Sequence, residues 1–292
     1  QMMTFASEIT KDYALKYLVG VRHGRAHRDG DIHIHDLDYY PTKTTTCIQY
    51  DLDDLFGRGF STKNGSVRSP QSIQSYATLA TIVFQTNQNE QHGGQSIPAF
   101  DHFMAPGVRK TFMKHLTDTL QFISRLNGSE AFEREACKGY IRESISSIEE
   151  NDRDKQALAE RMKAAGLEFT AEQLATAWRQ ALESTRKDTH QAMEGFIHNL
   201  NTMHSRGGNQ VVFSSINYGT DTSPEGRMVI RELLKATIEG LGHGEVPVFP
   251  IQIFKIKEGI SWCREDYEAA VRDFDKALAG GISFKAPNFD LL

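Results

Sequence analysis

Two histidines, two aspartates and a cysteine lie in one short stretch of this chain, and each carries a group that can take part in chemistry. His33 and His35 are separated by a single residue, and Asp36, Asp38 and Cys47 follow them. Alternation along a strand places both imidazoles on one face, so we predict a short strand here. Cys47 stands among threonines in a polar segment, which is not typical of a buried structural cysteine. Its thiol is therefore a candidate for redox or hydrogen-transfer chemistry.

The histidine pair has three interpretations. Two neutral imidazoles on one face suit zinc or iron, but the sequence has no further spaced set of His, Asp or Glu residues that looks like a completed coordination sphere. Polar residues of this kind also satisfy the backbone of a loop, which is the structural alternative. The third interpretation is a loop that binds a nucleotide or lines an active site. We predict no metal site, and the other two interpretations stay open.

Two polar, glycine-rich segments are weaker candidates for binding. We interpret residues 91–95, Gln-His-Gly-Gly-Gln, as a turn after an apolar helix, because paired glycines allow tight turns or a close approach of the backbone to a ligand. Residues 205–210, Ser-Arg-Gly-Gly-Asn-Gln, lead directly into a predicted strand, and loops at strand ends commonly hold sugar and phosphate groups. Neither segment is a Walker or dinucleotide-binding motif. Cys137 and Cys263 are predicted to be structural or incidental.

Composition excludes several classes of protein. The chain has 292 residues, of which 39% are hydrophobic and 24% charged, so it is long enough for one large or two medium domains with a real core. A net charge of −5 gives no basic surface for duplex DNA, and we predict no direct nucleic-acid contact. There is no run of about 18 apolar residues, so we predict no membrane-spanning helix. Three widely spaced cysteines favour a reducing cytoplasm over a disulfide framework.

Helices and strands alternate along the chain and must position these residues. Helices are predicted over 3–20, 51–56, 72–88, 100–126 and 225–239, and residues 129–204 are charged and mostly helical, with a break at Gly166 and a cap at Thr170. Strands predicted over 210–218 and 246–257 flank the last helix, and this β-α-β unit is typical of barrels and doubly wound sheets. The chain starts like the middle of a helix and ends, over 284–292, like the start of one. We therefore expect it to be part of a longer protein.

Seven motifs together resemble those of one known family. In chain order they are Asp29-Gly-Asp-Ile-His-Ile-His-Asp-Leu-Asp-Tyr-Tyr, Thr45-Thr-Cys47, Gln91-His-Gly-Gly-Gln-Ser-Ile-Pro98, Met104-Ala-Pro106, Ser205-Arg-Gly-Gly-Asn-Gln-Val, Phe213-Ser-Ser-Ile-Asn-Tyr-Gly219 and Phe249-Pro-Ile-Gln-Ile-Phe-Lys-Ile-Lys-Glu-Gly259. They resemble the anaerobic, class III ribonucleoside-triphosphate reductases, which are glycyl radical enzymes. The matches run in family order over nearly the whole chain.

The resemblance implies an α/β fold, the N-terminal part of a ten-stranded α/β barrel of the glycyl radical and ribonucleotide reductase type. Such a barrel has two antiparallel halves of five parallel strands, and here a large helical portion is added. We expect residues 1–292 to form one partial catalytic barrel domain. Within it, 1–128 carry the dimer and effector helices and the Cys47 strand, 129–204 form a helical excursion, and 205–292 supply barrel strands and helices.

The resemblance also implies a chemistry, the reduction of ribonucleoside triphosphates to deoxyribonucleoside triphosphates. In the family, a glycyl radical generates a thiyl radical that abstracts the 3′ hydrogen, a second cysteine delivers hydrogen to the 2′ carbon, and formate often supplies the reducing equivalents. Cys47 matches that second cysteine. The family's thiyl cysteine, radical glycine and C-terminal structural zinc site match no residues here, since Cys263 is out of context, and the N-terminal ATP-binding cone is also missing. The chain alone is therefore expected to be inactive.

Binding residues and partners follow from the same resemblance. The candidates for holding the substrate are neutral hydrogen-bonding side chains, Asn209, Ser214, Ser215 and Asn217. The candidates for binding a dNTP or ATP effector are His35, Arg68 and Gln71, since a cation such as Arg68 can meet phosphate. Implied partners are a radical-SAM activating enzyme and a second copy of the chain, with a two-fold interface on the apolar faces of the 72–88 and 100–126 helices.

Two other functions remain open. One is a glycyl radical enzyme with a non-nucleotide substrate, which the His-x-His-Asp and Gln-His-Gly-Gly motifs disfavour. The other is a non-catalytic module that binds nucleotides and dimerises. Nucleotide titration distinguishes that module from an enzyme, because the module binds dNTPs without turnover.

Overall fold

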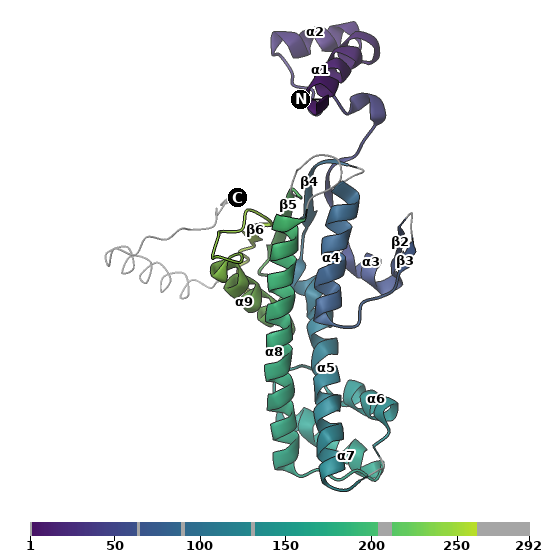
Figure 1. Cartoon of the computed structure of the whole chain (residues 1–292), viewed down its shortest axis with the longest axis vertical. Coiled ribbons are helices and arrows are strands. Elements are labelled where there is room, and N and C mark those ends of the chain that lie inside the picture. Colours follow the sequence, from purple (N-terminus) through teal and green to yellow (C-terminus); the bar gives the residue numbers. More distant parts are fainter. Residues whose placement is uncertain (1, 63–64, 89–90, 130–131, 204–211, 262–292) are drawn as a thin grey trace, which may run out of the picture.

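The computed structural model of this chain contains a four-stranded parallel sheet beside a layer of long helices (Figure 1). The structure describes residues 2–62, 65–88, 91–129, 132–203 and 212–261. In the sheet, β1 (Thr46–Gln49), β4 (His92–Ile97), β5 (Ser214–Tyr218) and β6 (Ile251–Phe254) lie side by side in chain order. All three neighbouring pairs are parallel, because helical connections return the chain to the same edge. The predicted α/β class and the β-α-β unit are confirmed.

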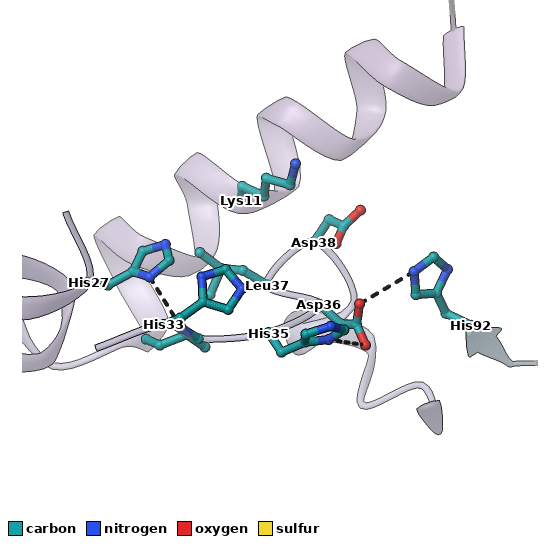
Figure 2. Close-up of a pocket in the computed structure, with 9 residues that line it drawn as sticks. Lys11, His27, His33, His35, Asp36, Leu37, Asp38 and His92 are labelled. Atoms are coloured by element: carbon teal, nitrogen blue, oxygen red, sulfur yellow. Dashed lines mark hydrogen bonds and ion pairs between the residues drawn. The ribbon is translucent and has the colours of Figure 1, made fainter. Parts of the chain in front are cut away.

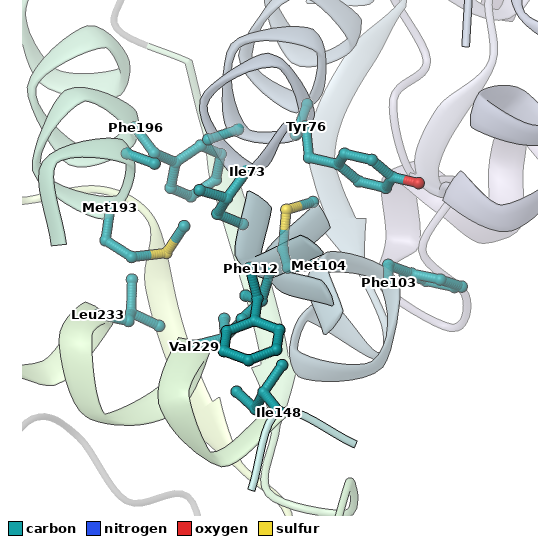
Figure 3. Packing of buried hydrophobic residues seen from close by; sticks show 14 of the residues in the cluster. Ile73, Tyr76, Phe103, Met104, Phe112, Ile148, Met193, Phe196, Val229 and Leu233 are labelled. Carbon is teal, nitrogen blue, oxygen red and sulfur yellow. The ribbon is translucent and has the colours of Figure 1, made fainter. Parts of the chain in front are cut away.

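Four helices pack on one another to form the layer beside the sheet. They are α4 (Ile73–Gln88), α5 (Phe100–Leu126), α8 (Ala171–Thr202) and α9 (Pro224–Glu239), and α5 contacts β5. Side chains from all four meet in one core, in which Phe112, Met193 and Leu233 approach one another (Figure 3). The helix predicted over 72–88 is confirmed as α4, and its Ile73, Ala77, Ala80 and Phe84 are buried at helical spacing.

The helices α4 and α5 cross closely because Gly107 has no side chain. A Cβ atom at position 107 would lie 2.8 Å from the ring of Tyr76 and 3.2 Å from the Cα of Ile73. The Nζ of Lys110 reinforces the crossing, since it donates to the Tyr76 hydroxyl (3.1 Å) and to the Pro70 carbonyl (2.9 Å). These contacts fix the segment that leads into α4.

Beyond the sheet, α5 and α8 continue as an arm that carries α6 (Arg134–Ser144) and α7 (Asp152–Ala164) (Figure 1). Trp178 is buried in this arm, where its Nε1 donates to the Ile148 carbonyl at 2.9 Å. The predicted cap is confirmed, since Thr170 and Gln173 form a capping box at the start of α8. The predicted break is also present, because Gly166 adopts a φ of +79° after α7.

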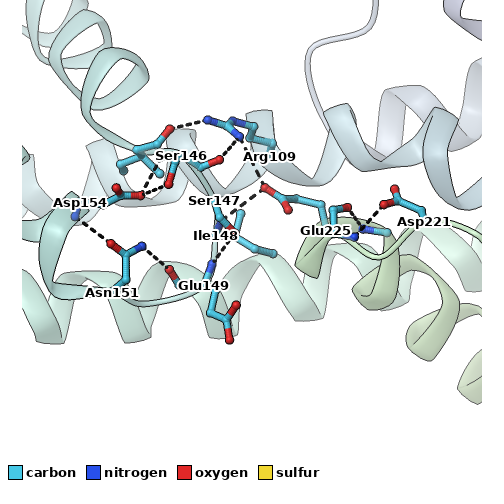
Figure 4. A network of polar contacts seen from close by, with 12 residues as sticks. Arg109, Ser146, Ser147, Ile148, Glu149, Asn151, Asp154, Asp221 and Glu225 are labelled. Carbon is cyan, nitrogen blue, oxygen red and sulfur yellow. Dashed lines mark hydrogen bonds and ion pairs between the residues drawn. The ribbon is translucent and has the colours of Figure 1, made fainter. Parts of the chain in front are cut away.

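A polar network ties the arm to α9 (Figure 4). The Arg109 guanidinium donates to two backbone carbonyls of the loop after α6, and it lies 3.8 Å from the Glu225 carboxylate. Glu225, which is buried, also accepts from the N–H of Ile148 at 3.3 Å. In the arm, Asp154 accepts from both the N–H and the hydroxyl of Ser146 at 2.7 Å. Buried carboxylates need such partners, so these bonds fix how the arm is oriented.

The N-terminal residues form a group of short helices near the start of β1 (Figure 1). Helix α1 (Met2–Tyr13) runs into a π-helical turn, η1 (Ala14–Leu18), and is followed by α2 (Val21–Asp29) and a 3₁₀ turn, η2 (Tyr40–Thr42). The 3–20 helix is thus confirmed, with a change of pitch near its end. After β1, the helix α3 (Leu52–Arg58) confirms the helix predicted over 51–56 and ends at Gly59, and a hairpin of β2 (Phe60–Thr62) and β3 (Gly65–Val67) follows.

Two predictions about local structure are wrong. The segment with His33 and His35 is a turn rather than a strand, because the Ile34 N–H donates to the His27 ring (3.2 Å) and Asp36 adopts a φ of +50°. Residues 92–97 form the strand β4, whereas we predicted a glycine-rich turn over 91–95. The strand predicted over 246–257 is confirmed only at its centre, as β6. Residues 284–292 lie outside the described residues.

The apolar faces of α4 and α5 are covered by their own chain. Both helices pack against α8, and α5 also packs against α9. This packing within the chain does not test the two-fold interface that we predicted on these helices, and the dimer stays a prediction from the resemblance.

Candidate functional site

The sheet has one face covered by helices and one open face. Along β5, Ser214, Ile216 and Tyr218 are buried, whereas Ser215 and Asn217 between them are half-buried. The register extends this alternation to β4, since Gln95 pairs with Ser214 on the covered face and Ser96 pairs with Ser215 on the open face. A substrate can reach only the open face, which makes it the candidate site.

Cys47 is exposed on β1, at the end of the sheet where the strands begin. The register slips at this point, because Thr46 pairs with His92 but Ile48 pairs with Gln95, so two glycines of β4 lie opposite one cysteine. A Cβ atom on Gly93 would lie 3.2 Å from the Sγ of Cys47. Glycine at this position therefore leaves the space that the thiol occupies.

Neutral polar side chains cross the open face from β1 to β5. The Ser96 hydroxyl donates to Asn217 Oδ1 at 3.4 Å, and Ser96 pairs in register with both Ser215 and Gln49. Apolar side chains border this polar row, and those of Phe213, Ile251 and Ile253 are exposed. Hydroxyl and amide groups both donate and accept hydrogen bonds, so the row suits the hydroxyls of a sugar.

The predicted substrate residues do not all share this face. Ser215 and Asn217 lie on it, but Ser214 is 1% exposed on the covered face, where its hydroxyl donates to the Val212 carbonyl. We correct the prediction for Ser214, because alternate residues of a strand point to opposite faces. Asn209 lies outside the described residues, as does Cys263.

His35 lines a hollow of about 430 Å³ beside the start of β4 (Figure 2). Asp36 stands between two imidazoles there, with its carboxylate oxygens 2.7 Å from His35 Nδ1 and 3.4 Å from His92 Nε2. The rings of His33 and His35 meet edge to face at 5.9 Å, so the two histidines are neighbours even though no strand forms. Cys47 does not line this hollow.

The hollow holds charges of both signs. Lys11 and Asp38 line it together with the histidines. Burial raises the pKa of the Tyr39 hydroxyl, and the charges of Asp38 and Asp36 raise it further. The Tyr39 ring also stacks on His92, with centroids 3.9 Å apart. The phenol beside His92 is therefore neutral near pH 7.

Arg68 and Gln71 line a different, larger groove of about 800 Å³ on the segment that leads into α4. Within the described part of the chain the Arg68 guanidinium makes no ion pair, and it is exposed. The Gln71 amide donates to the Ser69 carbonyl at 3.2 Å. The three predicted effector residues are thus divided between two places, because His35 lies in the histidine-lined hollow.

Cys137 is buried in α6, and burial raises the pKa of its thiol to about 11. This environment fits the structural role that we predicted. In the ranges that the structure describes, no group of three or more His, Cys, Asp or Glu residues has a geometry that could hold a metal ion. None of the described helices is long and apolar enough to cross a membrane.

Two residues of this region escaped the prediction from sequence, and a third, His92, was predicted only as part of the weaker binding segment 91–95. Gln49 and Ser96 complete the polar row, and His92 joins the histidine-lined hollow. In the structure, Gln95 and Ile97 are buried and Ser96 between them is half-buried, as in a strand. The two glycines just before Gln95 made this strand hard to recognise from the sequence. The pairing of His92 with Asp36 was hidden because the two residues are distant in sequence.

Comparison with known proteins identifies relatives over almost the whole chain. Residues 1–289 match the family described as anaerobic ribonucleoside-triphosphate reductase. The chain is 28% identical over 245 residues to the anaerobic ribonucleoside-triphosphate reductase of Enterobacteria phage T4, which covers 83% of this chain and 32% of the phage protein. It is 25% identical over 300 residues to the protein of that name from Haemophilus influenzae, covering 97% of this chain and 35% of the other. The chain thus spans about a third of the length of these relatives.

A solved structure shares the fold. It is the anaerobic ribonucleotide reductase of Thermotoga maritima with citrate in the active site, with a TM-score of 0.51 and 12% sequence identity. The match covers 95% of this chain and 44% of that one. At this identity the likeness concerns the fold alone, and it supports the expected barrel-type arrangement of parallel strands and helices.

Proposed function

Since this chain belongs to the anaerobic ribonucleoside-triphosphate reductase family, we propose that it takes part in converting ribonucleoside triphosphates to deoxyribonucleoside triphosphates. The single observation that carries the proposal is the position of Cys47, an exposed thiol at one side of a polar row on the open face of the sheet. The motif that contains Cys47 matches the family's hydrogen-donating cysteine.

We assign Cys47 the donation of hydrogen to the 2′ carbon of the ribose. An S–H bond is weak enough to give a hydrogen atom to a carbon radical, and the exposed position leaves room for a sugar. The glycyl radical of the family, which no residue described here carries, supplies the starting radical. The residues of this chain hold the sugar and deliver hydrogen to it.

The polar row orients the ribose in this proposal. Ser96, Ser215 and Asn217 offer two hydroxyls and one amide, none of which is ionised near pH 7. Neutral groups bind hydroxyls without introducing a charge beside a radical. The bordering apolar side chains, including Phe213, limit the access of water to the sugar.

Two further assignments rest on the family resemblance. Formate is proposed as the reductant, so that the net reaction is R–OH + HCOO⁻ + H⁺ → R–H + CO₂ + H₂O. The groove with Arg68 and Gln71 is proposed to bind a dNTP or ATP effector, since an exposed guanidinium that lines it suits phosphate. A radical-SAM activating enzyme, a second copy of the chain and a cytoplasmic location complete the proposal.

The test replaces single thiols in the activated reductase that contains this chain. We expect Cys47→Ser to abolish dNTP formation and to change NTP affinity by less than about threefold, because a hydroxyl retains the contact but its O–H bond is too strong to donate a hydrogen atom. Cys137→Ala is the matched control and should retain turnover, since Cys137 is buried in α6. Turnover by Cys47→Ser would disprove the role of Cys47, and dNTP binding without any turnover would favour the non-catalytic module.

A further inference from the structure

Asp36 holds two imidazoles that come from distant parts of the chain (Figure 2). One carboxylate oxygen lies 2.7 Å from His35 Nδ1, and the other lies 3.4 Å from His92 Nε2. The Asp36 side chain is only 15% exposed, whereas those of His35 and His92 are 75% and 40% exposed. A largely buried carboxylate thus fixes a histidine that solvent and a ligand can still reach.

His92 is held at three points. Its backbone N–H donates to the Thr45 carbonyl at 3.0 Å, its ring stacks on Tyr39 with an interplanar angle of 17°, and its Nε2 faces Asp36. Its Nδ1 has no hydrogen-bond partner among the residues that the structure describes. An imidazole that is oriented by a carboxylate through one nitrogen, with the other nitrogen free, is the arrangement that proton transfer requires.

The position of His92 relates this imidazole to the thiol. His92 pairs in register with Thr46, the neighbour of Cys47, and precedes Gly93, where a Cβ atom would lie 3.2 Å from Cys47 Sγ. Adjacent strands of a sheet are about 4.8 Å apart. The imidazole and the thiol therefore belong to the same end of the same strand pair.

The proposed reaction needs a proton near Cys47, at the start of the β1–β4 strand pair. With formate as the two-electron reductant and Cys47 as the donor of the hydrogen atom, the balanced equation still consumes one proton for the hydroxyl that leaves as water. Among the described residues, the polar row offers no acid that is protonated and ready to give up a proton near neutral pH, since hydroxyls and amides do not ionise there.

We propose that His92 donates this proton, and that Asp36 is the residue that positions it. The N–H of the protonated ring gives its proton to the 2′ oxygen, the bond between C2′ and that oxygen breaks, and water leaves. The neutral ring then regains a proton from solvent through the hollow. This inference rests on the proposed function and adds an acid to it.

Charged and titratable groups from every element around the hollow line it together with His92. Tyr39 covers one side of the ring, and α1 and α2 contribute one residue each. The full set is Lys11 from α1, His27 from α2, and His33, His35, Asp36, Asp38 and Tyr39 from the following turn. Because several of these groups can titrate, a change in the pH dependence of turnover is attributed to His92 only by comparing variants of His92 and Asp36.

The test compares two histidines that face a carboxylate at the same distance. His92→Gln removes the proposed acid, and His102→Gln is the matched control, because His102 Nε2 also lies 3.4 Å from a carboxylate, that of Asp53, on the surface. In the activated reductase that contains this chain, we expect His92→Gln to lower kcat by about 10²-fold or more and to flatten the pH–rate profile. We expect NTP affinity to change by less than about threefold, because binding and proton transfer are separate functions. His102→Gln should behave as the wild type in both respects.

Two further variants separate catalysis from structure. Asp36→Asn keeps the shape and tolerates a positive φ, so we expect a smaller loss of about tenfold with the protein still folded. In His92→Ala, added imidazole should restore turnover in proportion to its protonated fraction, which a purely structural role would not produce. Wild-type turnover and pH profile in His92→Gln, with Cys47→Ser inactive, would overturn the inference and leave the proposed function intact. An active Cys47→Ser would instead overturn the proposed function.

Discussion

Gly93 leaves free the space beside it that the thiol of Cys47 occupies. A Cβ atom at position 93 would be 3.2 Å from Cys47 Sγ and 3.3 Å from the Cys47 backbone nitrogen. Gly93 also adopts a φ of +93°, which side chains disfavour. Both constraints arise from the register slip between β1 and β4, where two residues oppose one. The space and the backbone conformation at Cys47 therefore require glycine at position 93 of β4.

We expect Gly93→Ala to destabilise the fold by about 1–2 kcal/mol, from the strained backbone and the lost space. It should also change the rate at which Cys47 reacts with iodoacetamide, since the thiol must move. Gly139→Ala in α6 is the control, because no atom lies within 4 Å of the added Cβ there. Urea unfolding and mass mapping of the Cys47 peptide measure the two effects. An unchanged stability and alkylation rate in Gly93→Ala would contradict the steric account.

The two described cysteines should differ in reactivity. Cys47 is exposed, whereas Cys137 is buried and burial raises the pKa of its thiol to about 11. Only the thiolate reacts, so at pH 8 we expect Cys47 to be alkylated while Cys137 stays protected until the protein unfolds. Peptide mapping after timed alkylation measures each cysteine separately. Rapid labelling of Cys137 in the folded protein would show that α6 is not packed as described.

The helices could be predicted from sequence because their signals are local. The inward positions of α4, such as Ile73 and Ala77, follow the helical period, and the cap of α8 follows from the spacing of Thr170 and Gln173. The β-α-β unit was equally plain, because an amphipathic helix separates two runs of strand-forming residues.

The remaining features depend on contacts between distant segments. The turn at His33 and His35 forms because the Ile34 N–H is bound by the His27 ring, which outweighs the strand-like alternation. β4 was missed because its polar, glycine-rich sequence becomes a strand only when β1 and β5 pair with its two edges. Which serine of the β5 pair faces the helices is likewise decided by packing, and the sequence alone does not distinguish them.

The crossing of α4 and α5 gives a prediction about stability. Gly107→Ala places a Cβ 2.8 Å from the Tyr76 ring and 3.2 Å from the Ile73 backbone, so we expect a loss of about 1–3 kcal/mol from overpacking. Gly195→Ala in α8 has open space around the new Cβ and should instead stabilise by up to about 1 kcal/mol through helix propensity. Thermal unfolding of both variants measures the difference. Equal effects of the two substitutions would contradict the close crossing.

Asp154 predicts how stability depends on pH. Burial raises the pKa of this carboxyl, but hydrogen bonds from the hydroxyl and N–H of Ser146 and from nearby groups outweigh burial, so the pKa lies below its ordinary value. A lowered folded-state pKa contributes stability above the ordinary, unfolded-state pKa, and this contribution is lost as pH falls through the folded-state pKa. We expect Asp154→Asn to cost about 1–2 kcal/mol at pH 7 and progressively less below about pH 4.

The control for Asp154 lies two residues away on the same helix. Asp152 has a fully exposed side chain and forms a surface ion pair with Lys155 at 3.0 Å. Surface pairs contribute little, so Asp152→Asn should change the free energy of unfolding by less than about 0.5 kcal/mol at either pH. Urea unfolding at pH 7 and pH 3.5 measures both variants. A constant penalty for Asp154→Asn across this range would show that its ionised form is not what stabilises the arm.

The last prediction uses neighbouring serines on opposite faces of one strand. Ser215 is half-buried on the open face beside Ser96 and Asn217, whereas Ser214 is buried under the helices. If the open face binds the ribose, each lost hydrogen bond should cost about 0.5–1.5 kcal/mol of binding free energy. Ser215→Ala and Asn217→Ala should therefore raise the KM for NTP about 3- to 10-fold with little effect on stability.

Ser214→Ala is the control for this prediction. It should leave KM unchanged and lower the stability by about 1 kcal/mol, because its hydroxyl satisfies the Val212 carbonyl. Steady-state kinetics in the activated reductase, with urea unfolding of the same variants, measures both effects. A raised KM in Ser214→Ala and an unchanged KM in the other two would contradict substrate binding on the open face of the sheet.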